Sequence, residues 1–424
     1  MGGELGFAGP AADRGMSLLS VAAWHRSRLC YCSNVHPAVH LDEVSSLISG
    51  TLEAIRNKRS LESMGSGLWL SAAAARRLTA GDGELARLRA LLDKHHIRLF
   101  TLNGFPFGNF HRDSVKERVY APDWSRSERL EYSLQLAEIL AQLLPPDEIE
   151  GTISTLPIGY DCDSTAYATA LRRLCHAASE LHRLEQRSGR RIRLCLEMEP
   201  GCMIESSDQL IRLFTRELPT VAAGEGVEPA LLQRHLGCCF DVCHQAVMFE
   251  DPYRSLQEIA AAGIAIGKMQ ISSALELTEP ADTAGRQALA EYVEPRYLHQ
   301  VRAGCGAGEV SGVMDLPLAL HRGALPWNCP WRIHFHVPIQ ADVLADGRLR
   351  TTRSAIGNAL DFLAYHRAIT PHLEVETYTW QLLPEGLRPQ TEEALQQGIV
   401  AELTWLEGEL RRRSLLREAE ADVG

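Results

Sequence analysis

Short apolar runs recur along the sequence, and most are followed by a segment with the 3.6-residue spacing of an amphipathic helix. This alternation favours a sheet of parallel strands covered by helices. No Gly-x-Gly-x-x-Gly pattern follows the first run, which weakens the alternative of an open dinucleotide-binding sheet. The sequence contains eight such strand–helix units, and this number favours an α/β fold of the closed (β/α)8 (TIM) barrel type. The eight predicted strands are Leu29–Ser33, Gly67–Ser71, Ile97–Asn103, Glu150–Leu156, Ile192–Glu197, Leu236–Asp241, Ile264–Ile271 and His372–Thr377.

The regular rhythm also predicts how the chain is divided. Residues 1–28 have no clear strand or helix pattern, and we interpret them as a flexible extension. The barrel is expected to occupy residues 29–389, with an insertion at about 274–331 after the seventh strand, where several prolines and glycines break the pattern. Residues 390–424 are predicted to form a C-terminal helix and a charged tail.

Composition narrows the classes of function. The 424 residues include 43 basic and 54 acidic side chains, a net charge of −11, which argues against a nucleic acid partner. No segment has the roughly 18 apolar residues of a transmembrane span. The eleven cysteines lie mostly in apolar segments without paired C-x-x-C motifs, so we interpret them, Cys239 and Cys243 included, as packing residues of a cytoplasmic protein.

Paired glutamates stand at the ends of two predicted strands. Glu197 and Glu199 are two residues apart, on one side of the fifth strand, and Glu374 and Glu376 repeat this spacing on the last strand. The carboxyl ends of barrel strands converge on one face, so these side chains are expected to surround one point. Buried carboxylates without partners are costly, and a divalent cation would relieve that cost. For a single glutamate, the simpler interpretation is a solvated strand end or an ion pair.

Other strand ends add potential ligands. Asp241 ends the sixth strand and His244 follows three residues later, while Gln270 stands near the end of the seventh. His334 and His336 lie on the same side of an additional extended segment, Arg332–Val337. We expect them to act as metal ligands, proton carriers or phosphate contacts. Together with the glutamates, Asp241 and His244 favour a shared polar centre.

The predicted loops supply candidates for substrate binding. A long loop of the kind that often carries function follows the third strand. It follows Asn103 and contains Phe105 and His111, while His36 and His299 lie in other loops. With Glu199, His334 and Glu374, these residues complete the predicted substrate-binding set.

Several segments resemble the bacterial metabolite traffic protein family of the ebo gene cluster (EboE). That family belongs to the xylose-isomerase-like TIM-barrel superfamily of sugar isomerases, ketose 3-epimerases and endonuclease IV. The resemblance runs from about Leu29 to Leu383. It rests on Tyr31–Pro37, Thr101–Phe107, Asp241–Ala246, Arg296–Val301, His334–Pro338 and Leu373–Trp380.

The resemblance implies a metal site. In the superfamily the ligands are a glutamate, the aspartate of Asp-x-x-His, a histidine and a final glutamate, which correspond here to Glu197, Asp241, Gln270 and Glu376. Glutamine replaces the usual histidine and is a weaker ligand for zinc. This leaves two expectations, a site for one divalent ion that prefers manganese or magnesium to zinc, or a metal-poor site. A histidine of the additional segment, His336 in particular, can substitute for Gln270.

Three functions follow as hypotheses. The first is a divalent-metal-dependent isomerase or epimerase of a small polyol-like or carbonyl metabolite, in a secondary-metabolite cluster whose other proteins are possible partners. In it, Glu197 and Glu376 transfer a proton through an enediolate, with His244 as a further catalytic residue. The second is a metabolite carrier with an apolar wall of Phe105, Phe107, Phe110 and Trp124. The third, an endonuclease IV-like phosphodiesterase, is disfavoured by the acidic charge and Gln270.

Overall fold

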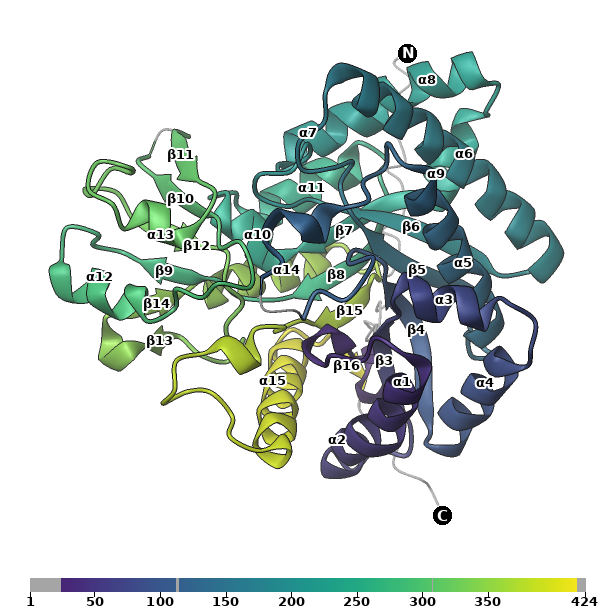
Figure 1. Cartoon of the computed structure of the whole chain (residues 1–424), viewed down its shortest axis with the longest axis horizontal. Coiled ribbons are helices and arrows are strands. Elements are labelled where there is room, and N and C mark those ends of the chain that lie inside the picture. Colours follow the sequence, from purple (N-terminus) through teal and green to yellow (C-terminus); the bar gives the residue numbers. More distant parts are fainter. Residues whose placement is uncertain (1–23, 112–113, 307, 418–424) are drawn as a thin grey trace, which may run out of the picture.

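The computed structural model describes residues 24–111, 114–306 and 308–417. Its centre is a sheet of eight parallel strands in the order β2-β15-β8-β7-β6-β5-β4-β3. A bridge between Cys32 and Gly67 joins the two ends of this sheet. The predicted (β/α)8 barrel is therefore confirmed (Figure 1). Its strands are β2 (Cys30–Tyr31), β3 (Met64–Trp69), β4 (Ile97–Asn103), β5 (Glu150–Thr155), β6 (Arg191–Glu197), β7 (Leu236–Asp241), β8 (Ile266–Ile271) and β15 (His372–Val375).

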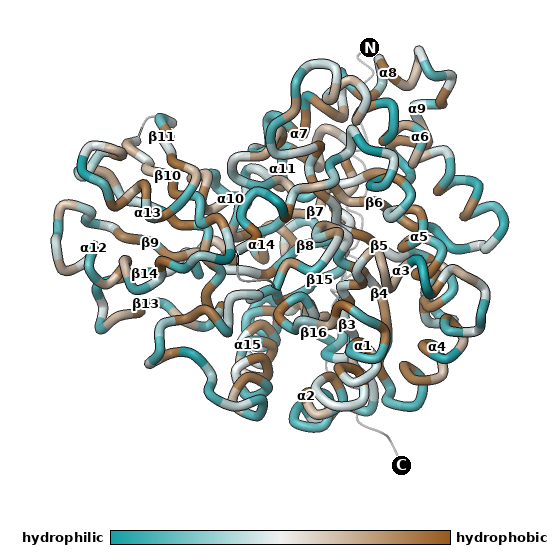
Figure 2. The backbone as a smooth tube through the Cα atoms, in the orientation of Figure 1, coloured by the Kyte–Doolittle hydropathy of each residue, from teal (hydrophilic) through white to brown (hydrophobic). Residues whose placement is uncertain are grey.

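Helices surround the barrel and bury their apolar faces against it. The predicted stripe Val44, Leu47, Ile48, Leu52 and Ile55 is buried. Helices such as α4 and α15 alternate hydrophobic and hydrophilic positions (Figure 2). Among the described residues, no helix is long and apolar enough to cross a membrane. The helices are α1 (Leu41–Leu47), α2 (Glu53–Lys58), α3 (Ala72–Leu78), α4 (Glu84–Lys94), α5 (Ser127–Leu143), α6 (Ser164–Ser188), α7 (Ser207–Arg212), α8 (Leu218–Glu225), α9 (Pro229–His235), α10 (Val242–Val247), α11 (Pro252–Ala261), α14 (Arg353–Tyr365) and α15 (Glu392–Arg412).

Local signals in the sequence explain where several helices begin. The Ser206 side chain accepts a hydrogen bond from the backbone N–H of Gln209, and the Gln209 side chain accepts one from the backbone N–H of Ser206, as the capping-box pattern predicts. Asp251 caps α11 through the backbone N–H of Arg254, and Pro252 occupies its first turn. These caps fix where the chain turns from a barrel loop into a helix.

A second sheet lies between β8 and α14 and forms a lobe beside the barrel (Figure 1). It has six strands in the order β11-β10-β12-β9-β14-β13. The predicted insertion ended at about residue 331, whereas this sheet continues to Thr351, and Trp331–Ile333 is one of its central strands. The elements of the lobe are β9 (Leu275–Leu277), α12 (Thr283–Ala290), β10 (Val301–Gly304), β11 (Val310–Val313), α13 (Leu316–Ala319), β12 (Trp331–Ile333), β13 (Val343–Leu344) and β14 (Leu349–Thr351).

The two ends of the described chain meet. Strand β1 (Trp24–His25) pairs in parallel with β16 (Leu416–Arg417), and Trp24 is buried. Within the predicted flexible extension 1–28, residues 24–28 therefore belong to the fold, whereas residues 1–23 lie outside the described residues. Residues 418–424 of the predicted tail also lie outside them.

The cysteines differ in one respect from the prediction. Cys305 and Cys329, which are 24 residues apart in the lobe, form a disulfide with a Cα–Cα distance of 5.0 Å. Spacing in the sequence gave no signal for this pair, because it depends on the antiparallel strands that bring the two residues together. The other nine cysteines are free, and eight of them are buried, as expected for packing residues.

Glu402 of helix α15 is fully buried and forms hydrogen bonds to the barrel. Its Oε1 accepts hydrogen bonds from Thr377 Oγ1 (2.6 Å) and Ile339 N (3.2 Å), and its Oε2 accepts one from Trp380 Nε1 (3.0 Å). Thr377 and Trp380 follow β15, whereas Ile339 follows β12. One carboxyl group thus joins the C-terminal helix to two segments at the mouth of the barrel.

This carboxyl group should make stability depend on pH. Burial raises the pKa of Glu402 from 4.5 to about 7, so between these values the folded state binds more protons than the unfolded state. Its contribution to stability therefore falls as the pH rises from about 4.5 to 7. Relative to Glu402→Gln, the wild type should lose up to about 1.4 kcal/mol of unfolding free energy per pH unit in this window. Urea denaturation of wild type and Glu402→Gln at several pH values measures this difference in unfolding free energy. If the unfolding free energies of the two proteins changed in parallel with pH, the prediction would be wrong.

Candidate metal centre

Three carboxylates converge where β6, β7 and β15 end. Glu197 and Asp241 are the last residues of β6 and β7, and Glu376 immediately follows β15. Each offers an oxygen within 4.8 Å of the others, and each side chain is buried. Burial and the neighbouring charges raise the pKa of Glu197 well above its usual value and that of Glu376 to about 8. Three of the polar residues predicted at the strand ends therefore lie together.

Hydrogen bonds hold Asp241 and Glu376 in place and leave one buried oxygen of Asp241 without a partner in the part of the chain that the structure describes. Asp241 Oδ1 accepts from the backbone N–H of His244 (2.9 Å) and from Ser272 Oγ (2.8 Å). Glu376 Oε1 accepts from Asn103 Nδ2 (3.1 Å) and from Asn34 Nδ2. Asp241 Oδ2 is buried and has no hydrogen-bond partner among the described residues. An acceptor in this position needs a donor or a cation.

Two imidazoles present nitrogen lone pairs to the same region. His244 Nδ1 donates to Met198 O and His336 Nδ1 donates to Glu376 O, both at 2.8 Å. A carbonyl oxygen only accepts, so each neutral ring keeps its lone pair on Nε2. Burial lowers the pKa of His336 to about 4, and its buried Nε2 has no hydrogen-bond partner among the described residues. His244, His336 and Asp241 offer ligand atoms within 4.8 Å of one another.

His334 connects this region to the lobe. Its Nε2 is 3.0 Å from His244 Nε2, and its Nδ1 is 2.7 Å from Gln300 Oε1. Gln300 Nε2 donates to Tyr120 Oη, which donates to Glu199 Oε1, both at 2.9 Å. Burial raises the pKa of Glu199 to about 7. A hydrogen-bonded chain therefore runs from His334 to Glu199 through Gln300 and Tyr120, which lie outside the barrel strands.

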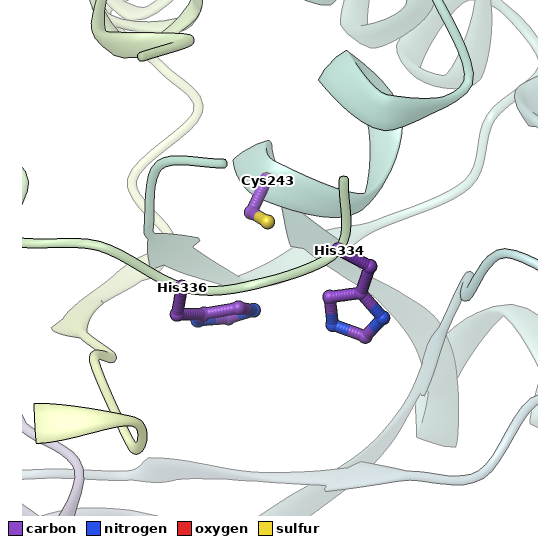
Figure 3. A group of neighbouring side chains, drawn as sticks. All are labelled: Cys243, His334 and His336. Atoms are coloured by element: carbon purple, nitrogen blue, oxygen red, sulfur yellow. The ribbon is translucent and has the colours of Figure 1, made fainter. Parts of the chain in front are cut away.

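Cys243 lies beside His334 and His336, which follow β12 of the lobe. Figure 3 shows the imidazoles of His334 and His336 projecting from one segment, with Cys243 on the neighbouring helix α10. Their ligand atoms lie within 4.8 Å of one another. Burial raises the pKa of the Cys243 thiol well above its usual value. The thiol is therefore neutral at physiological pH and is a weaker ligand than the imidazoles.

Gln270 and Glu374 lie deeper, inside the barrel. The thiol of Cys239 donates to Gln270 Oε1 at 3.1 Å, so the oxygen predicted as a ligand has a partner. Glu374 forms an ion pair with Lys268, whose Nζ is 2.6 Å from Glu374 Oε2, and both side chains are fully buried. Burial alone would lower the pKa of Lys268, but the Glu374 carboxylate raises it above its usual value. Neither Gln270 nor Glu374 lines the pocket above the carboxylates.

That pocket has an empty volume of about 580 Å³. Of the residues predicted to bind substrate, Asn103, Phe105, Glu199 and His334 line it, together with Glu197, His244, His336 and Glu376. Of the predicted aromatic wall, Phe105 and Phe110 line it. Phe107 instead packs against Tyr132, and Trp124 is fully buried with its Nε1 donating to Thr155 Oγ1.

The other loop histidines lie outside the pocket lining. His36 Nε2 is 2.9 Å from Tyr31 Oη, and His111 packs against Phe110. His299 Nδ1 donates to the backbone oxygen of His334 at 2.9 Å. His299 therefore supports the backbone of a pocket residue without lining the pocket.

Sequence reasoning missed four polar residues around the site. They are Asn34, Lys268, Tyr120 and Gln300. A lysine in the centre of an apolar strand, two residues before Gln270, was an available signal, because residues two apart share one face of a strand. Asn34 stands in one of the quoted motifs. Gln300 stands in another, Arg296–Val301. For Tyr120 the sequence offers no signal, because its contact with the lobe exists only in the folded chain.

The donor set fits a divalent cation. Three buried carboxylates that share one small volume repel one another, and a cation would offset this repulsion. The unpartnered Asp241 Oδ2 and His336 Nε2 supply an oxygen and a nitrogen, both common ligands of zinc and manganese. The backbone carbonyl bonded to Nδ1 of His336 is the kind of support that metal-binding histidines have.

No protein-family model matches the chain, and no curated protein matches its sequence. Among solved structures it is similar to a xylose isomerase domain protein from Planctomyces limnophilus, with 13% identity, a TM-score of 0.46 and coverage of 85% of this chain and 92% of that one. The IolI protein with a binding zinc atom has 12% identity, a TM-score of 0.45 and coverage of 91% and 98%. A xylose isomerase domain containing protein from Salmonella typhimurium has 12% identity, a TM-score of 0.40 and coverage of 90% and 98%. At these identities the likeness concerns the fold alone.

Proposed function

We propose that the protein is a divalent-metal-dependent isomerase or epimerase of a small metabolite with adjacent carbonyl and hydroxyl groups. The observation that carries this proposal is the convergence of Glu197, Asp241 and Glu376 beside the unpartnered Nε2 of His336. The three carboxylates lie at the carboxyl ends of barrel strands, where (β/α)8 enzymes have their active sites, whereas His336 follows β12 of the lobe.

The proposed ligands are Glu197, Asp241, Glu376 and His336. His336 then takes the position for which the resemblance gave Gln270, whose side-chain oxygen already accepts a hydrogen bond from Cys239. When bound, a divalent cation polarises the two substrate oxygens and stabilises negative charge that develops on them.

The two glutamates are proposed to move the proton. One carboxylate removes the proton from the carbon that carries the hydroxyl group. In epimerisation the other glutamate, protonated at the outset, gives a proton to the opposite face of the same carbon. In isomerisation it gives the proton to the adjacent carbon, and the hydroxyl proton moves to the former carbonyl oxygen. Asn34 and Asn103 orient the Glu376 carboxylate through their amide groups. His244 lines the same pocket and is proposed to donate a hydrogen bond to a substrate oxygen when protonated.

The cellular setting extends the proposal. We assign the protein to the EboE family of metabolite traffic proteins, with other proteins of its gene cluster as partners, on the basis of the motifs named above. We propose a cytoplasmic location from the nine free cysteines; the Cys305–Cys329 disulfide is of a kind that is rare in that compartment.

Proton exchange tests the chemistry without knowledge of the natural substrate. With manganese present, the wild type should incorporate deuterium from D2O into one or more members of a panel of α-hydroxyketones and α-hydroxyaldehydes, measured by mass spectrometry. Glu376→Gln should lower this rate by about 10²-fold to 10⁴-fold, because the amide accepts no proton. The control is Glu385→Gln at an exposed position. Equal exchange rates for wild type and Glu376→Gln would contradict the proposed role of Glu376. If the wild type exchanges deuterium into none of the probes, the proposed isomerase or epimerase activity is contradicted.

The apolar part of the pocket favours a second candidate, a metabolite carrier. Phe105 and Phe110 are buried and line the cavity above the carboxylates. A carrier would form a tight complex with a metabolite without turnover. Binding without deuterium exchange would therefore favour it.

A further inference from the structure

We propose that the substrate is unphosphorylated and carries an apolar group of about the size of an aromatic ring beside its paired oxygens. This inference rests on the proposed function and adds the substrate class. It follows from the apolar side chains that share the pocket lining with the carboxylates and imidazoles. It also follows from the hydrogen bonds of the one cationic side chain, of lysine or arginine, that the described lining contains.

Two kinds of side chain line the pocket. Carboxylates and imidazoles are the first kind. The second is an apolar wall of Phe105 and Phe110 from the loop after β4 and of Tyr297 and Leu298 from the lobe, all four of them buried, in which the ring centroids of Phe110 and Tyr297 are 6.1 Å apart. The side chains of Phe105, Phe110 and Leu298 cannot form hydrogen bonds, so the hydroxyl groups of a sugar would be left without partners against them. An apolar group beside the reacting carbons fits this wall.

The one lysine of the described pocket lining, Lys116, already has hydrogen-bond acceptors within the protein. Lys116 Nζ donates to Asp315 Oδ2 (2.6 Å), Tyr297 O (2.6 Å) and, more weakly, Glu294 O (3.4 Å). An ammonium group has three N–H donors, so these acceptors use all of them, and Asp315 balances its charge. Phosphate is held by free basic side chains, whereas the nearby carboxylates of the pocket would repel it.

The apolar wall is already assembled. The backbone N–H groups of Val115 and Lys116 both donate to Arg296 O, at 2.8 and 2.9 Å, which joins the β4 loop to the lobe. On the barrel side, Arg129 is fully buried and donates to the backbone oxygens of Gly104 and Phe105. Binding therefore needs little ordering of the wall, which favours a ligand of matching shape.

Three probes with the same α-hydroxyketone group test the inference. They are dihydroxyacetone, dihydroxyacetone phosphate and 2-hydroxyacetophenone. Isothermal titration of the manganese-loaded protein should show that 2-hydroxyacetophenone binds at least about tenfold more tightly than dihydroxyacetone, because its ring leaves water. The phosphate ester should bind no more tightly than dihydroxyacetone. Tighter binding of the ester, or equal affinity for all three probes, would overturn the proposal.

Two variants locate the contact. Phe110→Ala and Leu298→Ala should each reduce the preference for 2-hydroxyacetophenone over dihydroxyacetone by about threefold or more. Phe107→Ala, in the same loop but outside the pocket lining, should leave that preference unchanged. Preservation of the preference in both pocket variants would overturn the assignment of the wall, provided that circular dichroism shows both to be folded.

Deuterium exchange with the same probes separates this inference from the proposed function. If 2-hydroxyacetophenone binds preferentially but does not exchange deuterium at its hydroxymethyl carbon, the inferred ligand class is supported and the proposed isomerase activity is contradicted. If dihydroxyacetone exchanges deuterium but 2-hydroxyacetophenone does not bind preferentially, the proposed activity is supported and the inferred substrate class is contradicted.

Discussion

Replacing Asp241 with asparagine is expected to abolish high-affinity binding of a divalent cation. Asp241 belongs to both groups of possible ligands, with Glu197 and Glu376 on one side and with His244 and His336 on the other. Asparagine keeps the size of the side chain, and its oxygen can still accept the hydrogen bonds that Asp241 Oδ1 receives. It loses the negative charge and the free oxygen on which a cation depends.

Elemental analysis of protein purified without a metal-affinity tag measures this effect. About one manganese, zinc or iron per chain is expected in the wild type and less than about a tenth of that in Asp241→Asn, as for removal of an anionic ligand. Asp346→Asn is a matched control, because Asp346 is exposed and lies in the lobe. Magnesium, which is held more weakly, requires a separate titration. Equal metal content in wild type and Asp241→Asn would refute the proposed centre, and a wild type that binds no metal on titration would favour the carrier.

Replacing Lys268 with methionine is expected to destabilise the protein by about 3–5 kcal/mol. The Lys268–Glu374 pair is fully buried inside the barrel, and methionine leaves the Glu374 carboxylate there without its cation. The volume of the side chain changes little, so the loss comes mainly from the uncompensated charge. Urea denaturation measures it as a lower transition midpoint.

A double variant separates charge from packing. Lys268→Met combined with Glu374→Gln removes both charges and should recover a large part of the lost stability, because a neutral amide costs less to bury than a carboxylate. If Lys268→Met alone cost less than about 1 kcal/mol, the pair would contribute little to the fold. If the double variant were as unstable as Lys268→Met, lost packing would account for the effect.

The sequence determined the barrel and much of its polar mouth. Apolar runs with intervening helical periodicity specify strands and helices locally, and residues such as Glu197 and Asp241 can be assigned to strand ends because a strand stops where its apolar run stops. Parallel strands then bring their carboxyl ends to one face. The convergence of Glu197, Asp241 and Glu376 follows from these two facts.

Only the tertiary structure decided which other residues share that site. His336 lies beside Asp241 because the segment after β12 returns from the lobe to the mouth of the barrel, where His336 bonds the backbone of Glu376. Glu374, two residues before Glu376, lies deeper and pairs with Lys268. Tyr120 and Gln300, 180 residues apart, likewise meet only in the folded chain. Periodicity and spacing describe neighbours along the chain. Contacts between a loop and a separate sheet depend on how whole elements pack, which no local pattern records.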